Sequence, residues 1–547
     1  MIQGKSYDFI YVGGGHNCLT SAAYMAKADQ KVIVLEKRDI IGGGVMTEEL
    51  TLPGFKHNPH SNSHMWIFMG PVYYDLELKK YGAVYRYTPP FASVFEDGRC
   101  LILYRDIDRT VKQIEKFSLK DARTYKEMAE IWVKNIDFLV TSYIFSPPMS
   151  FGKMFTLFEG THEGREFLRM FMTSMEHLIE ELFENDRVKA WLLLMGSQVG
   201  MPHDMFGSGS FFTPMFPALH RAGAGICVGG VINLAKAMVK FIEEHGGVVR
   251  LNHEVKRIKV NNNGIATGVE LTDGGEIIAK KAVVTNLISP LVFGDKGLVD
   301  HAHLDENFLQ QVRRWRPGKV NLFSGHYAFD ESPLYKASEK EPDLQKVFMV
   351  GICEHSSVLT RQFNAGRVGE LPRGDAIGFI VLDASVTDAK QAPPGKHNPL
   401  LWHHATYEIS AEGGAKKWDE IKEDFNDECL KVWGKHAPNV LKKGTILGQC
   451  LETPLDLERR NPNFFKGDVM GGELGLDQQL IFRPFHGYPP YKTPIENLYM
   501  CGPSCHPGGG ASGAPGYNAT NIIAEDLKIK KWWKTPAYFG GAAGPEE

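Results

Sequence analysis

The order of apolar and polar positions near the N-terminus predicts a strand, a helix and a second strand. Residues 7–12 form a short, mostly apolar run of the kind that becomes a buried strand. A helical pattern follows from about 16 to 27, and residues 31–35 form a second apolar run. This order is typical of a β-α-β unit.

Two glycines stand at the turn between the first strand and the helix. Gly13 permits a tight turn, and Gly15 lets the backbone approach a pyrophosphate, which would lie at the N-terminus of the helix. Glu36 ends the second strand, where a carboxylate can bind a ribose 2′-OH and would repel a 2′-phosphate. Cys18 replaces the third glycine of the usual G-x-G-x-x-G pattern and is small enough to keep helix and strand in contact. The unit is therefore predicted to bind FAD or NAD, and not NADP.

Patterns after the first β-α-β unit predict further helices and a β-meander. Apolar positions at helical spacing predict helices at about 119–141 and 177–200. Short β-branched strands joined by N-G and D-G-G turns predict a meander between 248 and 286. Glycines at 223–230 are reminiscent of a second dinucleotide motif, but we expect no strand before them and find no acid at the right distance after them. A second nucleotide site is not predicted.

Length and composition restrict the class of protein. A chain of 547 residues is too long for one core, and 43% hydrophobic with 23% charged residues is typical of a soluble globular protein. The net charge of -4 provides no field for nucleic acid. Eight cysteines without a C-x-x-C pair indicate reduced thiols. Because no targeting segment is recognisable at the N-terminus, we expect a cytoplasmic protein.

The longest uncharged run, 138–152, is too short to span a bilayer. Part of 138–158, together with 205–219, could line an apolar substrate tunnel or rest on a membrane surface. The plainer interpretation is that both stretches belong to the core of a second domain.

A polar loop at 57–64 contains three histidines in the spacing H-x-x-H-x-x-x-H. Such a spacing can hold a metal, but Pro59 would break the helix that would align the ligands, so no metal site is predicted. Two further histidines, His403 and His404, lie in a strand-like run, where alternation places one on each face.

The most specific pattern lies at 493–527. Residues 497–501 form a strand-like run that leads into a glycine-rich loop, and a helix is predicted from about 514 to 527. This arrangement directs backbone N–H groups and a helix N-terminus at a ligand. For a flavin the target would be the N1/O2 edge, where reduction places negative charge.

Several of these segments resemble phytoene-dehydrogenase-like oxidoreductases of the amine oxidase and phytoene desaturase superfamily. Glu36-Lys37-Arg38 and Ile41-Gly42-Gly43-Gly44 are similar to that family's acid, basic residue and double glycine, with Gly44 where the family often has arginine. The other resembling segments are LYMCGPSCHPGGGASGAPGYNA, APPGKH, PLDLERR and GELGLDQ. The same group includes proteins named for a pyridine nucleotide-disulfide oxidoreductase domain.

The resemblance implies an α/β fold with a discontinuous, Rossmann-type FAD-binding domain and an inserted, mixed α+β substrate domain. The FAD domain would comprise 1–70, 220–300 and 480–547, and the substrate domain 71–219 and 301–479. Spacing indicates that Gly13, Gly15 and Glu36 bind the cofactor. The resemblance adds further expected FAD-binding residues, which are Lys37, Gly43, Gly44, Val255, Gly502, Pro515, Gly516 and Asn518.

Chemistry at a carbon–carbon bond is the activity that the resemblance implies. The flavin would exchange a hydride, and a positioned base or water would handle the proton, so that an apolar or conjugated substrate is desaturated or saturated. His506 would face the chamber beside the flavin, and His60 and His64 are further candidates. A structural hydrogen bond is the alternative for each. Oxygen, a quinone or a separate reductase would be the electron partner.

Two other functions stay open at this point. Flavoenzymes similar to 2-haloacrylate hydratase use reduced FAD to hydrate a small activated alkene without net redox change. The remaining hypothesis is a flavin-bearing interaction protein without turnover.

Overall fold

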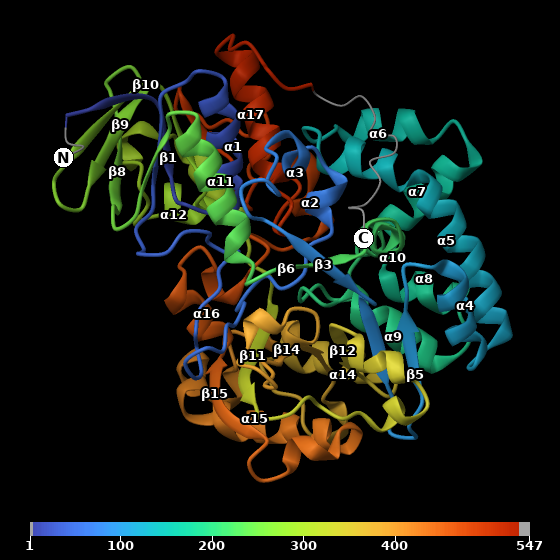
Figure 1. The fold of residues 1–547 in the computed structure, drawn as a ribbon. Coiled ribbons are helices and arrows are strands. Elements are labelled where there is room, and N and C mark those ends of the chain that lie inside the picture. The colour runs from blue at the N-terminus through green and yellow to red at the C-terminus, as the bar shows by residue number, and fades with distance from the viewer. Residues whose placement is uncertain (1–3, 535–547) are drawn as a thin grey trace.

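The computed structural model describes residues 4–534, apart from the side chains of 211–213, and contains two large sheets (Figure 1). The first sheet, with its helices, contains both ends of the described chain. The second lies beside it and is covered by helices from the middle of the sequence. This mixed α/β architecture agrees with the expected fold class.

The first sheet, within the described residues, has seven strands in the order β7-β2-β1-β10-β9-β8, with β16 beside β10. The predicted β-α-β unit forms its centre, because β1 runs parallel to both β2 and β10. The strands are β1 (Ser6–Val12), β2 (Val32–Leu35), β7 (Val248–Arg250), β8 (Val255–Val260), β9 (Ala266–Leu271), β10 (Glu276–Thr285) and β16 (Leu498–Met500).

One group of helices packs on this sheet. Helix α1 (His16–Lys27) contacts both α11 (Ile232–Glu244) and α17 (Ala514–Asp526), which brings the two ends of the sequence together. The bounds of α1 and α17 agree with the helices predicted at 16–27 and 514–527. Two further helices, α12 (Ser289–Phe293) and α13 (Glu306–Arg314), follow β10.

The second sheet has the order β15-β11-β14-β13-β12-β4-β5 in the described part of the chain. Most of its strands are buried on both faces, which explains why they read as continuous apolar runs. Helix α15 (Trp418–His436) covers one face, and α14 (Ser356–Arg367) lies against the other. The strands are β4 (Phe91–Val94), β5 (Cys100–Leu103), β11 (Val320–Phe329), β12 (Met349–Ile352), β13 (Phe379–Leu382), β14 (Leu400–Thr406) and β15 (Ile446–Glu452).

A helical region stands beside the second sheet (Figure 1). It consists of α4 (Ile107–Glu115), α5 (Leu119–Leu139) with a π-helical turn (Val140–Ile144), α6 (Phe151–Phe158), α7 (His162–Met172), α8 (Met175–Leu182), α9 (Asp186–Gly196) and α10 (Gly209–Ala222). The single helix predicted at 177–200 was wrong, because α8 ends at Leu182 and Asn185 caps α9. The Asn185 side chain accepts hydrogen bonds from the backbone N–H groups of residues 187 and 188.

Short elements complete the described chain. Helices α2 (Trp66–Met69) and α3 (Val72–Asp75) follow the histidine loop, and α16 (Pro454–Arg460) follows β15. Strands β3 (Tyr85–Thr88) and β6 (Ala224–Cys227) pair with each other in a small separate sheet. The glycines at 223–230 therefore surround a strand that the sequence did not reveal, but this strand does not belong to the nucleotide-binding sheet.

The strands of the first sheet fall within 1–70, 220–300 and 480–547, and those of the second within 71–219 and 301–479. We therefore propose the division into an FAD-binding and a substrate domain with these bounds. None of the helices between residues 4 and 534 has the length and apolar character needed to cross a membrane.

Candidate functional site

A cavity of about 470 Å³ is lined by both sheets. At one end its walls come from the first sheet, through the turn after β1, the end of β2 and the start of β8. At the other end they come from α9, α10 and four strands of the second sheet. We call the first part the nucleotide end and the second the chamber.

The glycine turn is shaped by close contacts. Gly13 has a φ of +95°, a conformation that favours glycine. A Cβ atom on Gly15 would lie 2.1 Å from Nδ2 of Asn286, and one on Gly14 would lie 2.3 Å from Cδ1 of Ile41. Side chains are therefore excluded from Gly14 and Gly15, and the backbone of this turn lines the cavity.

Glu36 lies at the end of β2 and is nine-tenths buried. Its carboxylate accepts a hydrogen bond of 2.7 Å from the backbone N–H of Gly14 and one of 2.9 Å from that of Arg38. An ionised carboxylate has about four acceptor directions, so acceptor capacity is left for ribose hydroxyls. Glu36 thus joins the glycine turn to the cavity wall.

The other predicted residues of the nucleotide end, Lys37, Gly43, Gly44 and Val255, also line the cavity. Gly43 has a φ of +60°, and a Cβ on it would lie 3.1 Å from Cα of Gly15. The two glycine segments therefore approach each other closely.

Unpaired polar groups show that the nucleotide end fits FAD. The first turn of α1 has no side-chain cap, so its N–H groups are free to bind a phosphate. The side-chain oxygens of Asn17 and Asn286 are buried without a hydrogen-bond partner. Both residues line the cavity, and the ribityl chain of FAD carries hydroxyl groups that could donate to such oxygens.

The C-terminal loop reaches the cavity through Pro503, Gly509, Gly510 and Ala511. Nε2 of His16, at the start of α1, donates a 3.0 Å hydrogen bond to the carbonyl oxygen of Gly510. This contact joins the loop to the glycine turn.

The four C-terminal residues assigned by resemblance, Gly502, Pro515, Gly516 and Asn518, are not among the cavity-lining residues in the described structure. A Cβ on Gly516 would lie 2.0 Å from the carbonyl oxygen of Asn17, and one on Gly502 would lie 2.2 Å from that of Asn286. Nδ2 of Asn518 donates to the carbonyl oxygens of Ile144 and Ser146, at 2.9 and 3.1 Å. These residues pack behind the lining, and their assignment to the flavin stays a prediction.

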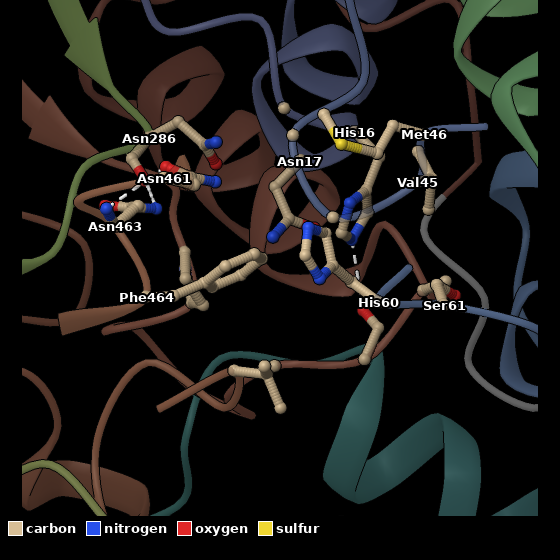
Figure 2. A pocket seen from close by; sticks show the side chains of 18 of the residues that line it. His16, Asn17, Val45, Met46, His60, Ser61, Asn286, Asn461, Asn463 and Phe464 are labelled. Carbon is tan, nitrogen blue, oxygen red and sulfur yellow. Dashed lines mark hydrogen bonds between the residues drawn. The ribbon is translucent and has the colours of Figure 1, made fainter. Parts of the chain in front are cut away.

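His60 lies at the cavity wall and is nine-tenths buried. The centroid of its ring lies 4.6 Å from that of Phe464, and neither ring nitrogen has a partner in the structure. Both side chains are labelled in Figure 2. Burial lowers the pKa of His60 to about 3. Among the three histidine candidates, His60 has both ring nitrogens available for a ligand.

His64 also lines the cavity, but its ring nitrogens are engaged. Nδ1 forms a 2.7 Å hydrogen bond with the hydroxyl of Tyr85, and Nε2 forms one of 2.9 Å with that of Ser61. Burial lowers its pKa to about 3. These contacts favour the structural alternative for His64.

His506 lies outside the cavity lining that the structure describes. Its Nε2 donates a 2.5 Å hydrogen bond to the carbonyl oxygen of Tyr143, and its own carbonyl accepts one from the hydroxyl of Tyr491. Burial lowers the pKa of His506 to about 4. These contacts favour the structural alternative for His506, and we propose that it anchors the loop; its position beside the flavin stays a prediction.

This anchoring role leads to a prediction. His506→Ala should lower protein stability by about 1–3 kcal/mol, because the partly buried carbonyl of Tyr143 loses its partner. FAD content and turnover should then fall together on warming. Thermal unfolding followed by flavin fluorescence would measure this, with the exposed His162→Ala as control. A loss of turnover at full FAD content and unchanged stability would restore the catalytic role.

The sequence offered an apolar tunnel lined by part of 138–158 and by 205–219; Met215 and Leu219 of the second stretch line the chamber, and no residue of the first is part of the described lining. The walls of the chamber are mainly apolar and come from helices and strands far apart in the chain. They include Met195, Met215, Leu219, Leu322, Met349, Leu382 and Trp402. Periodicity indicated that such side chains would be buried, but it could not show which of them face a cavity. The alternation at His403 and His404 is observed: His404 contacts Ser197, on the side of α9, and His403 contacts Phe425 of α15.

The segment 461–464 is a further part of the lining that sequence reasoning missed. Nδ2 of Asn463 donates a 3.2 Å hydrogen bond to the carbonyl oxygen of Asn286 (Figure 2). Oδ1 of Asn463 accepts a 2.8 Å hydrogen bond from the backbone N–H of Ile288. Its position directly after PLDLERR was the one available signal.

Comparison with known proteins finds a matching family model and several similar sequences. The model of the family described as flavin containing amine oxidoreductase matches residues 19–411. The chain is 28% identical to a limonene dehydrogenase subunit from Castellaniella defragrans, over 98% of each sequence. It is 29% identical to pyridine nucleotide-disulfide oxidoreductase domain-containing protein 2 of Rattus norvegicus, over 95% of this chain and 94% of that protein.

Among solved structures, an oxidoreductase from Methanosarcina mazei superposes with a TM-score of 0.60. The match covers 94% of this chain and 99% of that one at 16% sequence identity. At this identity the likeness concerns the fold alone.

Proposed function

The chain belongs to the flavin-containing amine oxidoreductase family, and from this premise we propose that it desaturates or saturates a carbon–carbon bond of an apolar or conjugated substrate. It is an FAD-dependent oxidoreductase, which makes a binding role without turnover the weaker alternative. As such it acts on a small molecule and exchanges electrons with a partner. The bond and the substrate class are the proposal.

The observation that supports this substrate class is the apolar chamber beside the loop at 509–511. Its methionine, leucine and tryptophan side chains favour an uncharged ligand, since burial of an unpaired ammonium group in such surroundings is costly. Transfer of apolar surface out of water contributes about 25 cal/mol per Å² to binding. A hydrocarbon would therefore gain its affinity from these walls.

The name of one relative points in the same direction. The limonene dehydrogenase protein is named for an alkene hydrocarbon, and it matches this chain over almost its full length. We infer from that name and from the apolar chamber that the substrate here is an alkene or a compound that becomes one.

The residues of the chain would divide the work between binding and orientation. FAD, when bound, supplies the capacity to accept or return a hydride. Glu36 and the glycine turn hold its nucleotide part, while the apolar chamber excludes water and positions the substrate. His60, which is neutral above its low pKa, would hold the water or substrate group that exchanges the proton.

Anaerobic absorbance spectra of the flavin would test the proposal. Limonene, the alkene in the relative's name, is added to the oxidised and to the photoreduced holoenzyme. We expect stoichiometric bleaching of the oxidised form or reoxidation of the reduced form, because hydride exchange changes the flavin redox state. Conversion by the reduced enzyme alone, without net redox change, would instead support hydration of an activated alkene.

The electron partner can be found in the same way. Oxygen, a quinone and a separate reductase are the candidates, and each is added after a single turnover. Restoration of the original flavin spectrum would identify the partner.

A further inference from the structure

A second cavity, of about 630 Å³, adjoins the chamber. It lies among the start of β11, the end of α14 and the loops at 199–206 and 468–477. Val199 and Met470 line both cavities, so these two residues form the wall between them. We call this wall the partition.

The chamber needs a path to solvent once FAD is in place. Exposed lining residues gather at the nucleotide end, where Lys37, Glu254 and Lys296 lie. The residues that hold the cofactor are at that same end. The chamber's main wall residues, such as Met195, Met349 and Leu382, are buried. The partition separates this buried chamber from a cavity that reaches the surface at Phe206, whose side chain is 65% exposed.

The main chain of Met470 is held in place. Its N–H donates a 2.7 Å hydrogen bond to the carboxylate of Asp468. Its carbonyl oxygen accepts hydrogen bonds from the N–H of Gly509 at 2.9 Å and from Arg483 at 2.8 Å. The Met470 side chain has three rotatable bonds and can adapt its shape. The partition therefore combines a fixed backbone with an adjustable side chain, and Gly509 links it to the cofactor loop.

The walls of the second cavity suit an apolar ligand. Its apolar lining residues are Met201, Pro202, Met205, Phe206, Val320, Leu474 and Leu476. At the rim, Arg367 and Asp204 neutralise each other in an ion pair. Glu473 and Asp477 pair with Arg316, and Asp468 accepts hydrogen bonds from backbone N–H groups. Apart from Lys319, the remaining lining is mainly hydrophobic.

We propose that the second cavity holds the far end of an elongated apolar substrate whose reacting end lies in the chamber. Met470, with Val199, then determines how much of the substrate's length passes the partition. The shared wall at Val199 and Met470 and the apolar walls of both cavities carry this inference. It rests on the proposed function for the reacting end, but substrate binding can be measured without turnover.

The test uses three acyclic isoprenoid alkenes of increasing length: myrcene, farnesene and squalene. Each is titrated into the oxidised holoenzyme, and the shift of the flavin absorbance gives the dissociation constant. In the wild type, affinity should rise from myrcene to the longer alkenes, because the added length enters the second cavity. Met470→Trp should weaken farnesene and squalene by roughly tenfold or more and leave myrcene unchanged.

Met470→Ala should retain the tight binding of the longer alkenes, because it widens the partition. Met172→Trp, at an exposed methionine outside both cavities, is the matched control. FAD content and thermal unfolding of each variant show that it has folded. The inference is overturned if wild-type affinity does not rise from myrcene to farnesene, or if Met470→Trp weakens all three alkenes equally or none.

Flavin bleaching in the same samples separates the two proposals. Length-dependent binding that responds to Met470, without bleaching by any alkene, would keep the second cavity and reject desaturation. Bleaching with the same length dependence in wild type and Met470→Trp would keep desaturation and reject the role of the partition.

Discussion

Glu36→Ala is expected to weaken FAD binding by about 100-fold or more. Two charge-assisted hydrogen bonds from the ribose would be lost, each worth roughly 1.5–3 kcal/mol, and about 1.4 kcal/mol corresponds to a factor of ten. The structure adds a second reason, because the same carboxylate accepts hydrogen bonds from the backbone of Gly14 and Arg38. The glycine turn would lose its side-chain link to the end of β2, while the backbone hydrogen bond from Gly13 to Leu35 remains.

Isothermal titration of the apoprotein with FAD would measure this change. Glu254→Ala is a suitable control, since Glu254 is an exposed carboxylate that also lines the nucleotide end. It should bind FAD almost as the wild type does. Equal affinities of the Glu36 variant and the wild type would remove Glu36 from the FAD site.

His60→Ala is expected to lower the turnover rate by about 100-fold, at the lower end of the range for groups that assist proton transfer. FAD content should stay near that of the wild type, because His60 makes no hydrogen bond that holds the cofactor loops. His60→Asn, which keeps a donor and an acceptor, should recover part of the rate. A purely structural role would not produce this partial recovery.

The pH dependence provides a further check on His60. Burial lowers its pKa to about 3, so the side chain is neutral throughout the range above about pH 4. We therefore expect no limb near pH 6.5, the ordinary value for histidine, in the wild-type profile of turnover rate against pH. A limb at that pH that disappears in His60→Ala would contradict a neutral His60. The control is His64→Ala, which removes the neighbouring buried histidine.

Much of the nucleotide end could be predicted from local sequence patterns. Gly13, Gly15 and Glu36 lie within one β-α-β unit, so their separation along the chain largely determines their separation in space. Residues assigned by resemblance near this unit, such as Lys37 and Gly43, also line the cavity. Val255 does so as well, because β8 begins there.

The roles of the histidine candidates could not be predicted from local sequence patterns. His506 was the first candidate by resemblance, and His60 and His64 were further candidates, because a histidine beside a glycine-rich or polar loop can face a cavity or support the loop. Their partners favour one of these roles for each residue. The carbonyl that binds His506 belongs to Tyr143, which is 363 positions away in the chain. No local pattern reports such a contact.

The sequence by itself determined the α/β fold class, a dinucleotide site for FAD or NAD and the location of the nucleotide end, because short apolar runs, glycine turns and an acid at a set distance act over a few tens of residues. The resemblance to a flavoprotein family indicated that the dinucleotide is FAD. Only the tertiary structure decided the walls of the apolar chamber, the partition at Val199 and Met470, and the different contacts of the histidines. These features depend on which side chains from distant segments meet, and periodicity indicates burial without indicating the neighbour.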